Sequence, residues 1–232
     1  MKRYALLAVL VIATVAAMTA AWWSMRPPAP EVAVSEVERF EYQADTRPTV
    51  EVYGDSITQG WSNNFAAGDF ADRAWLNYVG GAEGVRFIGG SAVPGMKAYE
   101  SIQGIVPQQT ADVVVWAFGT NDIGTDSTWE RFRDGADEFY QATLLDDPAQ
   151  FVVVAVGPMD RRPGELVAAW NARTEALAEE RGWTFVDPFG DMRASSGEWA
   201  DESLTYDGLH PTAEAAERMS EAMVPVIRSV AG

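Results

Sequence analysis

Five short apolar segments, separated by segments with helical periodicity, dominate the chain from residue 49 onwards. The predicted strands are residues 49–53, 85–89, 112–118, 151–156 and 183–186. The predicted helices lie near residues 70–79, 97–108, 128–145, 163–181 and 211–229. Two of the strands are rich in valine and show no polar alternation, which is typical of strands buried on both faces. This order of elements predicts one three-layer α/β/α domain around a parallel sheet of about five strands.

The last two predicted helices each show an apolar face. In the fourth helix, Leu166, Trp170 and Leu177 recur at offsets of four and seven. The last helix follows the chain's single histidine, and Pro211 is expected in its first turn, where a missing N–H costs nothing. Its predicted buried stripe consists of Ala215, Ala216, Met219, Met223, Val226 and Ile227. Both helices are therefore expected to pack against the sheet.

The beginning of the chain differs from the rest in composition. Lys2 and Arg3 precede an uncharged, almost wholly apolar run from Ala5 to Ala21, which two tryptophans follow. A basic start and an apolar run are typical of an export signal, and this run is also long enough to span a bilayer. We therefore expect residues 1–25 to be an export signal or an N-terminal membrane anchor, which places the remainder outside the cytoplasm.

Residues 26–46 open with a proline-rich stretch and continue with mixed acidic and small residues. Such a composition favours an extended, semi-rigid tether. The folded domain is expected to span residues 47–232, because neither an internal repeat nor a second boundary follows. A domain that is exported and tethered in this way is expected to meet extracellular or cell-envelope substrates.

Several kinds of function are excluded by the net charge, by the absence of cysteine and by the presence of only one histidine. The 232 residues carry a formal net charge of −17, no cysteine and one histidine, His210. An acidic field repels phosphate backbones, which argues against nucleic acid as a partner. The absence of cysteine excludes disulfides, thiolate catalysis and zinc–cysteine sites. A single histidine excludes multi-histidine metal sites, whereas a site for a hard cation made of carboxylates stays open.

Four polar segments stand at the ends of predicted strands or in loops. They are Gly54-Asp55-Ser56-Ile57, residues 89–96, Gly119-Thr120-Asn121-Asp122, and Asp207-Gly208-Leu209-His210-Pro211. Open α/β sheets bind ligands in crevices just beyond the carboxyl ends of their strands. If the first three strands are neighbours, these segments meet at one edge of the sheet.

These segments supply what acyl transfer through a serine requires. Ser56 is a poor nucleophile until an adjacent base takes its proton, and His210 is the only imidazole in the chain. Asp207, three residues before the histidine, can reach the far ring nitrogen across a turn. The backbone N–H groups of Ser56 and Gly95 and the side-chain amide of Asn121 can stabilise the oxyanion of a tetrahedral intermediate.

In their order and intervals, the four segments resemble the sequence blocks of the SGNH hydrolases, also called GDSL esterases or lipases. The resemblance extends over residues 53–211, and the name-giving block differs only by Ile57, which replaces a leucine. It implies a flavodoxin-like fold and a catalytic domain at residues 47–232. It also implies carboxylic ester hydrolysis through an acyl-enzyme, without a metal or organic cofactor.

Carried over to the matching positions, the resemblance implies a role for each residue of the site. Ser56 would be the nucleophile, His210 the general base and acid, and Asp207 the residue that orients the histidine. The oxyanion hole would consist of Ser56, Gly95 and Asn121. Two further glycines in the second segment, at positions 89 and 90, compete with Gly95, which is preferred because the chain after it leads towards the next helix.

The expected substrate is a small-molecule or glycan ester. The short segments leave little room for a large lid, which favours short acyl groups, acetyl included, over long-chain fats. Trp61, Asn63 and Asn64 follow the serine closely, and Trp129 and Trp199 are expected in or near loops. An indole beside amides can stack on a sugar or form a wall for an acyl group, although core packing is the more frequent role of a single tryptophan.

Three alternatives remain open at this stage. One is transfer of the acyl group to a carbohydrate hydroxyl instead of water, which the sequence does not separate from hydrolysis. The second is a non-catalytic surface binding module on the same scaffold, against which the intact set of site residues argues. The third is a metal-dependent hydrolase that uses the carboxylates of Asp55, Asp122 and Asp207.

Overall fold

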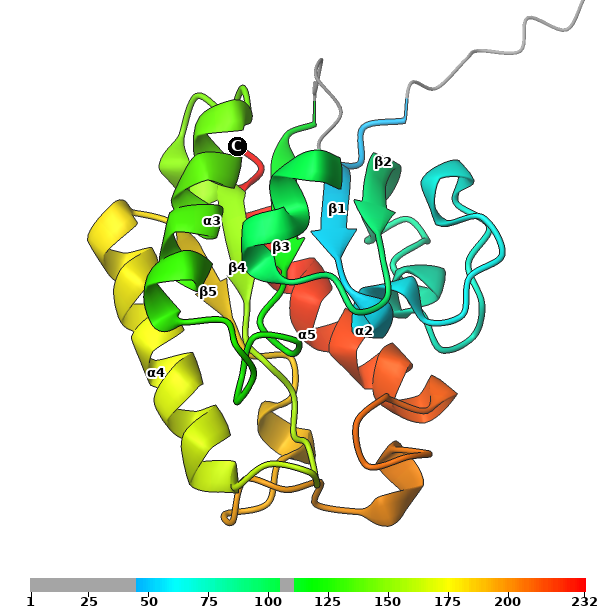
Figure 1. Ribbon diagram of the computed structural model, residues 1–232. Helices are drawn as coiled ribbons and strands as arrows, with labels where there is room; N and C mark the ends of the chain where they lie inside the picture. Colours follow the sequence, from blue (N-terminus) through cyan, green and yellow to red (C-terminus); the bar gives the residue numbers. More distant parts are fainter. Residues whose placement is uncertain (1–44, 105–110) are drawn as a thin grey trace, which may run out of the picture. The chain divides into compact units, whose positions relative to one another are not determined.

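The computed structural model describes residues 45–104 and 111–232, which Figure 1 shows as a ribbon. The export signal or membrane anchor and all but the end of the tether are expected in residues 1–44, which lie outside the described residues. In the described part of the chain, no helix is both long enough and apolar enough to cross a bilayer.

Five parallel strands form the predicted sheet. They are β1 (Thr49–Gly54), β2 (Arg86–Ala92), β3 (Val113–Ala117), β4 (Phe151–Val154) and β5 (Thr184–Val186). Their order across the sheet is β2-β1-β3-β4-β5, and every neighbouring pair is parallel. This is the flavodoxin-like order, in which the strand order reverses between β1 and β3. The predicted α/β/α fold with five parallel strands is therefore confirmed.

Helices cover both faces of this sheet (Figure 1). One face carries α3 (Trp129–Ala142) and α4 (Gly164–Arg181), and the other carries α5 (Ala213–Val230). Successive side chains of a strand point to opposite faces. Accordingly Val115 is buried in the core under α5, whereas Trp116 is buried in the core under α3 and α4.

The edge strand β2 is irregular at Ile88, two residues before Gly90. Its register with β1 shifts between Val50 and Glu51. Gly90 has a φ of 136°, and a Cβ there would stand 1.9 Å from the carbonyl oxygen of Val52. Only glycine allows the two backbones to approach so closely, so Gly90 lets β2 pair with β1 directly after the irregularity. The neighbouring Gly89 lies in the same strand, with nothing within 4 Å of the place of its missing Cβ.

Two of the predicted helices are wrong in type. The segment near residues 70–79 contains only the short 3-10 helix η3 (Trp75–Tyr78). The segment near 97–108 contains the 3-10 helix η4 (Ala98–Gly104) in its described part, while residues 105–108 lie outside the described residues. Side chains from other parts of the chain bind backbone N–H groups at the start of both segments. Ala71 donates to a serine hydroxyl at 3.3 Å, and Ala98 donates to the carboxylate of Asp122 at 3.1 Å. These bonds to side chains outside each segment, rather than helical propensity, set the local backbone path.

The predicted face of the fourth helix needs one correction. Trp170 and Leu177 are buried as expected, but Leu166 is 40% exposed and the adjacent Val167 is buried in its place. Val167, Trp170, Thr174 and Leu177 recur at offsets of three and four and form the face that packs on the core, so Leu166 lies outside this face.

The last helix starts later than predicted. Pro211 precedes α5 instead of standing in its first turn. The reason is a side-chain cap: the hydroxyl of Thr212 accepts the N–H of Ala215 at 3.5 Å, and the helical residues begin after it. The predicted stripe is otherwise buried, with Val226 at its half-buried edge.

Candidate active site

The carboxyl ends of β1 and β3 lie side by side at the centre of the sheet, where Gly54 pairs with Ala117. The strand order reverses at this point, and flavodoxin-like sheets bind ligands at such a reversal. The chain after β1 carries Ser56, and the chain after β3 carries Asn121. Figure 1 shows the short helix α2 (Ser56–Gln59) at the end of β1. The topology therefore brings two of the expected site residues to one edge.

Ser56, His210 and Asp207 form a continuous chain of hydrogen bonds. The Oγ of Ser56 lies 3.0 Å from the Nε2 of His210, and the Nδ1 of His210 lies 2.8 Å from the Oδ2 of Asp207. The first of these contacts joins residues 154 positions apart. An imidazole held between a hydroxyl and a carboxylate can take the hydroxyl proton while the carboxylate balances the charge that develops.

The turn from Asp207 to His210 is stabilised by its own backbone. The Oδ1 of Asp207 accepts the N–H of Leu209 at 3.1 Å and that of His210 at 2.8 Å, which leaves Oδ2 for the imidazole. Burial opposes ionisation of this carboxyl, but the two N–H groups and the imidazole outweigh it and lower the pKa of Asp207 below its ordinary value. The carboxylate is thus fixed in the charged form beside the ring.

Asp55, directly before the serine, is a buried carboxyl with 1% of its surface exposed. As the N-cap of α2, its Oδ1 accepts the N–H of Ile57 at 2.9 Å, and its Oδ2 accepts from the Nδ2 of Asn121 at 3.2 Å. Burial raises the pKa of Asp55 to about 7, against the opposing effect of hydrogen bonds from Ile57 and Thr120. Asp55 therefore holds Ser56 at the helix start and links it to the loop after β3.

The loop after β2 is bound to both neighbouring loops. The N–H of Val93 donates to the carbonyl of Gly54 at 3.0 Å, and the Nδ2 of Asn121 donates to the carbonyl of Met96 at 3.0 Å. Gly95, one residue before that carbonyl, is exposed and has a φ of 80°. The two competing glycines lie inside β2 instead, so Gly95 is the one that stands in this loop.

Asn121 already uses its side-chain amide within the protein. The amide nitrogen has two hydrogens, and two acceptors, Asp55 Oδ2 and the carbonyl of Met96, lie within 3.2 Å of it. Donation by Asn121 to an oxyanion therefore requires one of these bonds to be exchanged or shared.

Aromatic and cationic side chains surround the histidine, and two of them were not identified from the sequence. The ring of Tyr206 stacks on His210 with centroids 5.7 Å apart, and Trp61 meets the imidazole edge-on at 5.0 Å. The guanidinium of Arg73 lies 4.5 Å from the centre of the Tyr206 ring. The position of Tyr206 directly before Asp207 was a usable signal, whereas nothing in the sequence around Arg73 indicates its place.

The remaining residues that the sequence suggested for substrate contact have structural roles or stand apart. Trp199 is 8% exposed and packs edge-on against a phenylalanine. Trp129 is half-buried and stacks on Phe132 at 5.3 Å. Asn64 caps the 3-10 turn that follows it, while Asn63 is exposed. Core packing is thus the role that the structure gives to these two tryptophans.

The three carboxylates considered for a metal site are engaged separately. Asp122 accepts the N–H of Ala98 at 3.1 Å and the hydroxyl of Ser127 at 2.5 Å, and burial raises the pKa of Asp122. Asp55 and Asp207 bind the groups described above. Within residues 45–104 and 111–232, no three acidic or histidine side chains are grouped closely enough to hold a metal ion.

Several solved structures share this fold. A GDSL-like lipase from Bacteroides thetaiotaomicron is 20% identical, with 78% of this chain and 88% of that chain covered and a TM-score of 0.59. A catalytic mutant of an acetylxylan esterase from Geobacillus stearothermophilus is 16% identical, with 78% and 94% covered and a TM-score of 0.60. An α/β hydrolase enzyme from the metagenome of Lake Arreo, Spain, is also 16% identical, with 78% and 94% covered and a TM-score of 0.61.

No curated protein matches the chain. Residues 52–218, well over half of the chain, match the family described as GDSL-like Lipase/Acylhydrolase. This match contains Ser56, Asn121, Asp207 and His210, the residues whose contacts are described above. The chain therefore belongs to the GDSL-like lipase/acylhydrolase (SGNH hydrolase) family and is a carboxylic ester hydrolase.

Proposed function

We propose that this chain is an exported serine esterase that hydrolyses short-acyl esters, acetyl esters above all, through a covalent acyl-enzyme at Ser56. The observation that supports the proposal most directly is the hydrogen-bonded chain from Ser56 Oγ through the imidazole of His210 to the carboxylate of Asp207, with distances of 3.0 and 2.8 Å. These are the distances at which a base can take the proton of a serine hydroxyl.

The proposed reaction has two halves that use the same groups. In the first, Ser56 Oγ bonds to the ester carbonyl carbon while His210 takes the hydroxyl proton and passes it to the leaving alcohol oxygen. In the second, water attacks the acyl-enzyme, and His210 takes a proton from the water and returns it to Ser56. Asp207 keeps the ring in one tautomer and balances its charge when it is protonated.

The negative oxygen that forms in each half needs hydrogen-bond donors. We assign this role to the backbone N–H groups of Ser56 and Gly95 and to the side chain of Asn121. The bond from Asn121 to Met96 fixes the amide beside the loop that carries Gly95. Since the amide also binds Asp55, the oxyanion would compete with that carboxyl or with the Met96 carbonyl for an N–H.

Two further observations support the substrate class and the location. The fold resembles that of an acetylxylan esterase, which is an enzyme acting on acetyl groups carried by a polysaccharide. Lys2, Arg3 and the apolar run after them are typical of a segment that directs export. An exported acetylesterase would meet esters of small molecules or glycans outside the cytoplasm.

Replacement of Ser56 by alanine tests the proposal. Ser56→Ala should remove labelling by a fluorophosphonate and lower kcat for p-nitrophenyl acetate by about 10⁴-fold or more, because no nucleophile remains for the acyl group. A control is Ser195→Ala, which removes an exposed hydroxyl outside the site and should leave both measurements unchanged. If Ser56→Ala, correctly folded by circular dichroism, still cleaves the ester at the wild-type rate, the proposed mechanism is wrong.

A further inference from the structure

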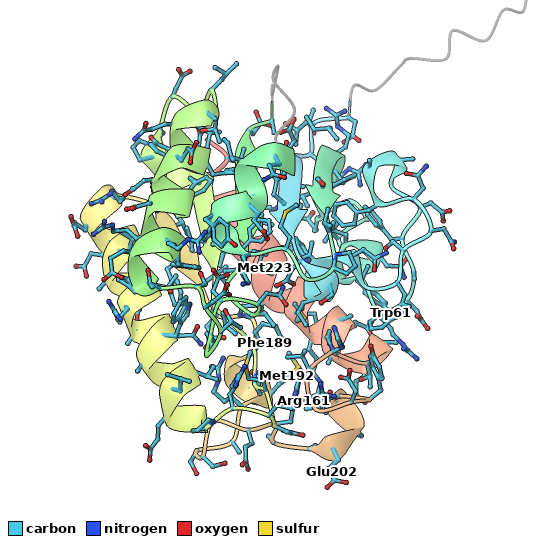
Figure 2. All side chains as sticks on the ribbon, in the orientation of Figure 1. Trp61, Arg161, Phe189, Met192, Glu202 and Met223 are labelled. Atoms are coloured by element: carbon cyan, nitrogen blue, oxygen red, sulfur yellow. The ribbon has the colours of Figure 1, made fainter. Side chains whose placement is uncertain are left out.

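Two large aromatic side chains beside the imidazole are exposed instead of buried. Trp61 is 48% exposed and Tyr206 is 41% exposed, although most of the large apolar side chains in the described part of the chain are buried. Their ring centroids lie 5.0 Å apart at an interplanar angle of 76°. Figure 2 labels Trp61, which is separated from the end of α2 only by the C-cap Gly60. We call Trp61, Tyr206 and the guanidinium of Arg73 the aromatic platform.

The backbone at Trp61 is held in an unfavourable conformation. Its φ of 62° is the only positive φ of a non-glycine residue among residues 45–104 and 111–232. The side chain of Gln59 fixes this conformation from both sides, since its Oε1 accepts the N–H of Trp61 at 2.8 Å and its Nε2 donates to the carbonyl of Ser62 at 2.9 Å. A bulky residue in such a conformation costs about 1–3 kcal/mol and points to a function for the position of its ring.

The platform also carries polar groups. The guanidinium of Arg73 lies 4.5 Å from the Tyr206 ring centre and 5.5 Å from that of Trp61, so its position is set by both rings. It offers N–H donors beside these two rings in a chain whose net charge is −17. An exposed indole next to such donors suits a ligand that has both an apolar face and hydroxyl groups.

The platform lies where the alcohol part of the ester is expected. During acylation His210 passes its proton to the alcohol oxygen as the bond from the carbonyl carbon to that oxygen breaks. The alcohol part of the substrate must therefore leave past the imidazole, where Trp61 meets the ring edge-on at 5.0 Å and Tyr206 stacks on it. In the proposed mechanism the carbonyl oxygen faces the donors on Ser56, Gly95 and Asn121, so it is the alcohol part that meets the platform.

We infer that the aromatic platform binds the alcohol part of the substrate and that this part is a pyranose sugar. The C–H face of the sugar packs on the exposed indole of Trp61, and its hydroxyls accept hydrogen bonds from Arg73. Tyr206 supports the indole and the guanidinium from the side of the histidine. This inference rests on the proposed serine esterase function, and it identifies the alcohol to which the acetyl group is bonded.

The test compares acetyl esters that differ only in the alcohol: an acetylated methyl xylopyranoside, phenyl acetate and ethyl acetate. In Trp61→Ala the ratio of kcat/KM for the sugar ester to that for ethyl acetate should fall about tenfold to a hundredfold, because only the sugar loses a stacking partner. With kcat/KM for ethyl acetate as the common reference, Arg73→Gln should lower the relative kcat/KM for the sugar ester more than that for phenyl acetate. The control Leu166→Ala removes an exposed side chain from α4 and should leave every ratio unchanged.

Several results would overturn the inference. An equal loss on all three esters in Trp61→Ala would mean that the indole only positions His210. A loss on phenyl acetate without one on the sugar ester would assign the platform to aryl alcohols. In the wild-type protein, methyl xylopyranoside without acetyl groups should inhibit phenyl acetate cleavage competitively, and the absence of inhibition would contradict the inference without any variant. Ester cleavage that survives Ser56→Ala would instead refute the proposed function.

Discussion

Asp55 and Asp207 are carboxyls of one site that their surroundings hold in opposite states. Burial raises the pKa of Asp55 to about 7, so this group keeps its proton in mildly acidic solution. At Asp207 burial acts in the same direction, but the N–H groups of the turn and the imidazole outweigh it and lower the pKa. The neutral carboxyl serves the backbone and Asn121, and the charged one serves the histidine.

The raised pKa of Asp55 should make the fold less stable as pH increases. The unfolded carboxyl ionises near its ordinary value of 3.8, while the folded one ionises only at about 7, so the folded state binds more protons between these values. By linkage, the contribution of this group to the free energy of unfolding is fully present below pH 3.8 and is lost as the pH rises towards 7. In urea unfolding, the wild type should lose about 2 kcal/mol more than Asp55→Asn between about pH 5 and about pH 7.

A matched control for this prediction is Asp146→Asn, which changes an exposed carboxyl outside the site. This variant should show the same pH dependence as the wild type. The assignment fails if the wild type and Asp55→Asn lose equal stability over this interval. A lower overall stability of Asp55→Asn is expected as well, because its new amide would face the amide of Asn121, but this offset does not change with pH.

At the level of single residues, the sequence predicts those whose identity is tied to a local pattern. Ser56, Asp207 and His210 stand in short segments of unusual polarity, and the fold brings them into contact. The neighbours of the imidazole cannot be predicted in the same way. Trp61 meets the imidazole, and Arg73 meets the Tyr206 ring beside it, only because the segments after α2 and before η3 approach the final turn in space.

Among the elements, strands were predictable and several helices were not. The valine-rich runs of β3 and β4 are buried on both faces, and their short length and β-branched residues favour a strand over a buried helix. The segments that form η3 and η4 carry helical periodicity, but backbone N–H groups at their start bind side chains 9 and 24 positions away in the chain. The indole N–H of Trp116 likewise donates to the hydroxyl of Ser101 within η4 at 3.1 Å. Such bonds exist only after the sheet has formed, so local sequence does not reveal them.

The close approach of β2 to β1 at Gly90 leads to a prediction about two adjacent glycines. Gly90→Ala should destabilise the protein by about 3 kcal/mol, because the new Cβ would stand 1.9 Å from the Val52 carbonyl oxygen at a φ of 136°. Gly89→Ala has open space and should change stability by less than about 1 kcal/mol. Thermal unfolding of both variants decides the matter, and equal melting temperatures would contradict the role assigned to Gly90.

For the molecule as a whole, the net charge of −17 should affect which esters are cleaved efficiently. An acidic surface repels a polyanion at long range, and salt screens this repulsion over a Debye length that falls from about 30 Å at 0.01 M to about 10 Å at 0.1 M. The kcat/KM for an acetylated polygalacturonate should therefore rise severalfold over this salt range. Cleavage of an uncharged ester such as p-nitrophenyl acetate should stay constant, and a parallel rise for both would exclude the electrostatic explanation.

The contact between Ser56 and His210 spans 154 positions of the chain and closes only when the segment before α5 lies against α2. A ribosome makes the serine long before it makes the histidine. Until the last helix has been completed and packed, the hydroxyl has no base within reach, since His210 is the only imidazole in the chain. The nucleophile is thus synthesised early but activated late. Ser56 in an unfinished chain should therefore not react with esters during synthesis.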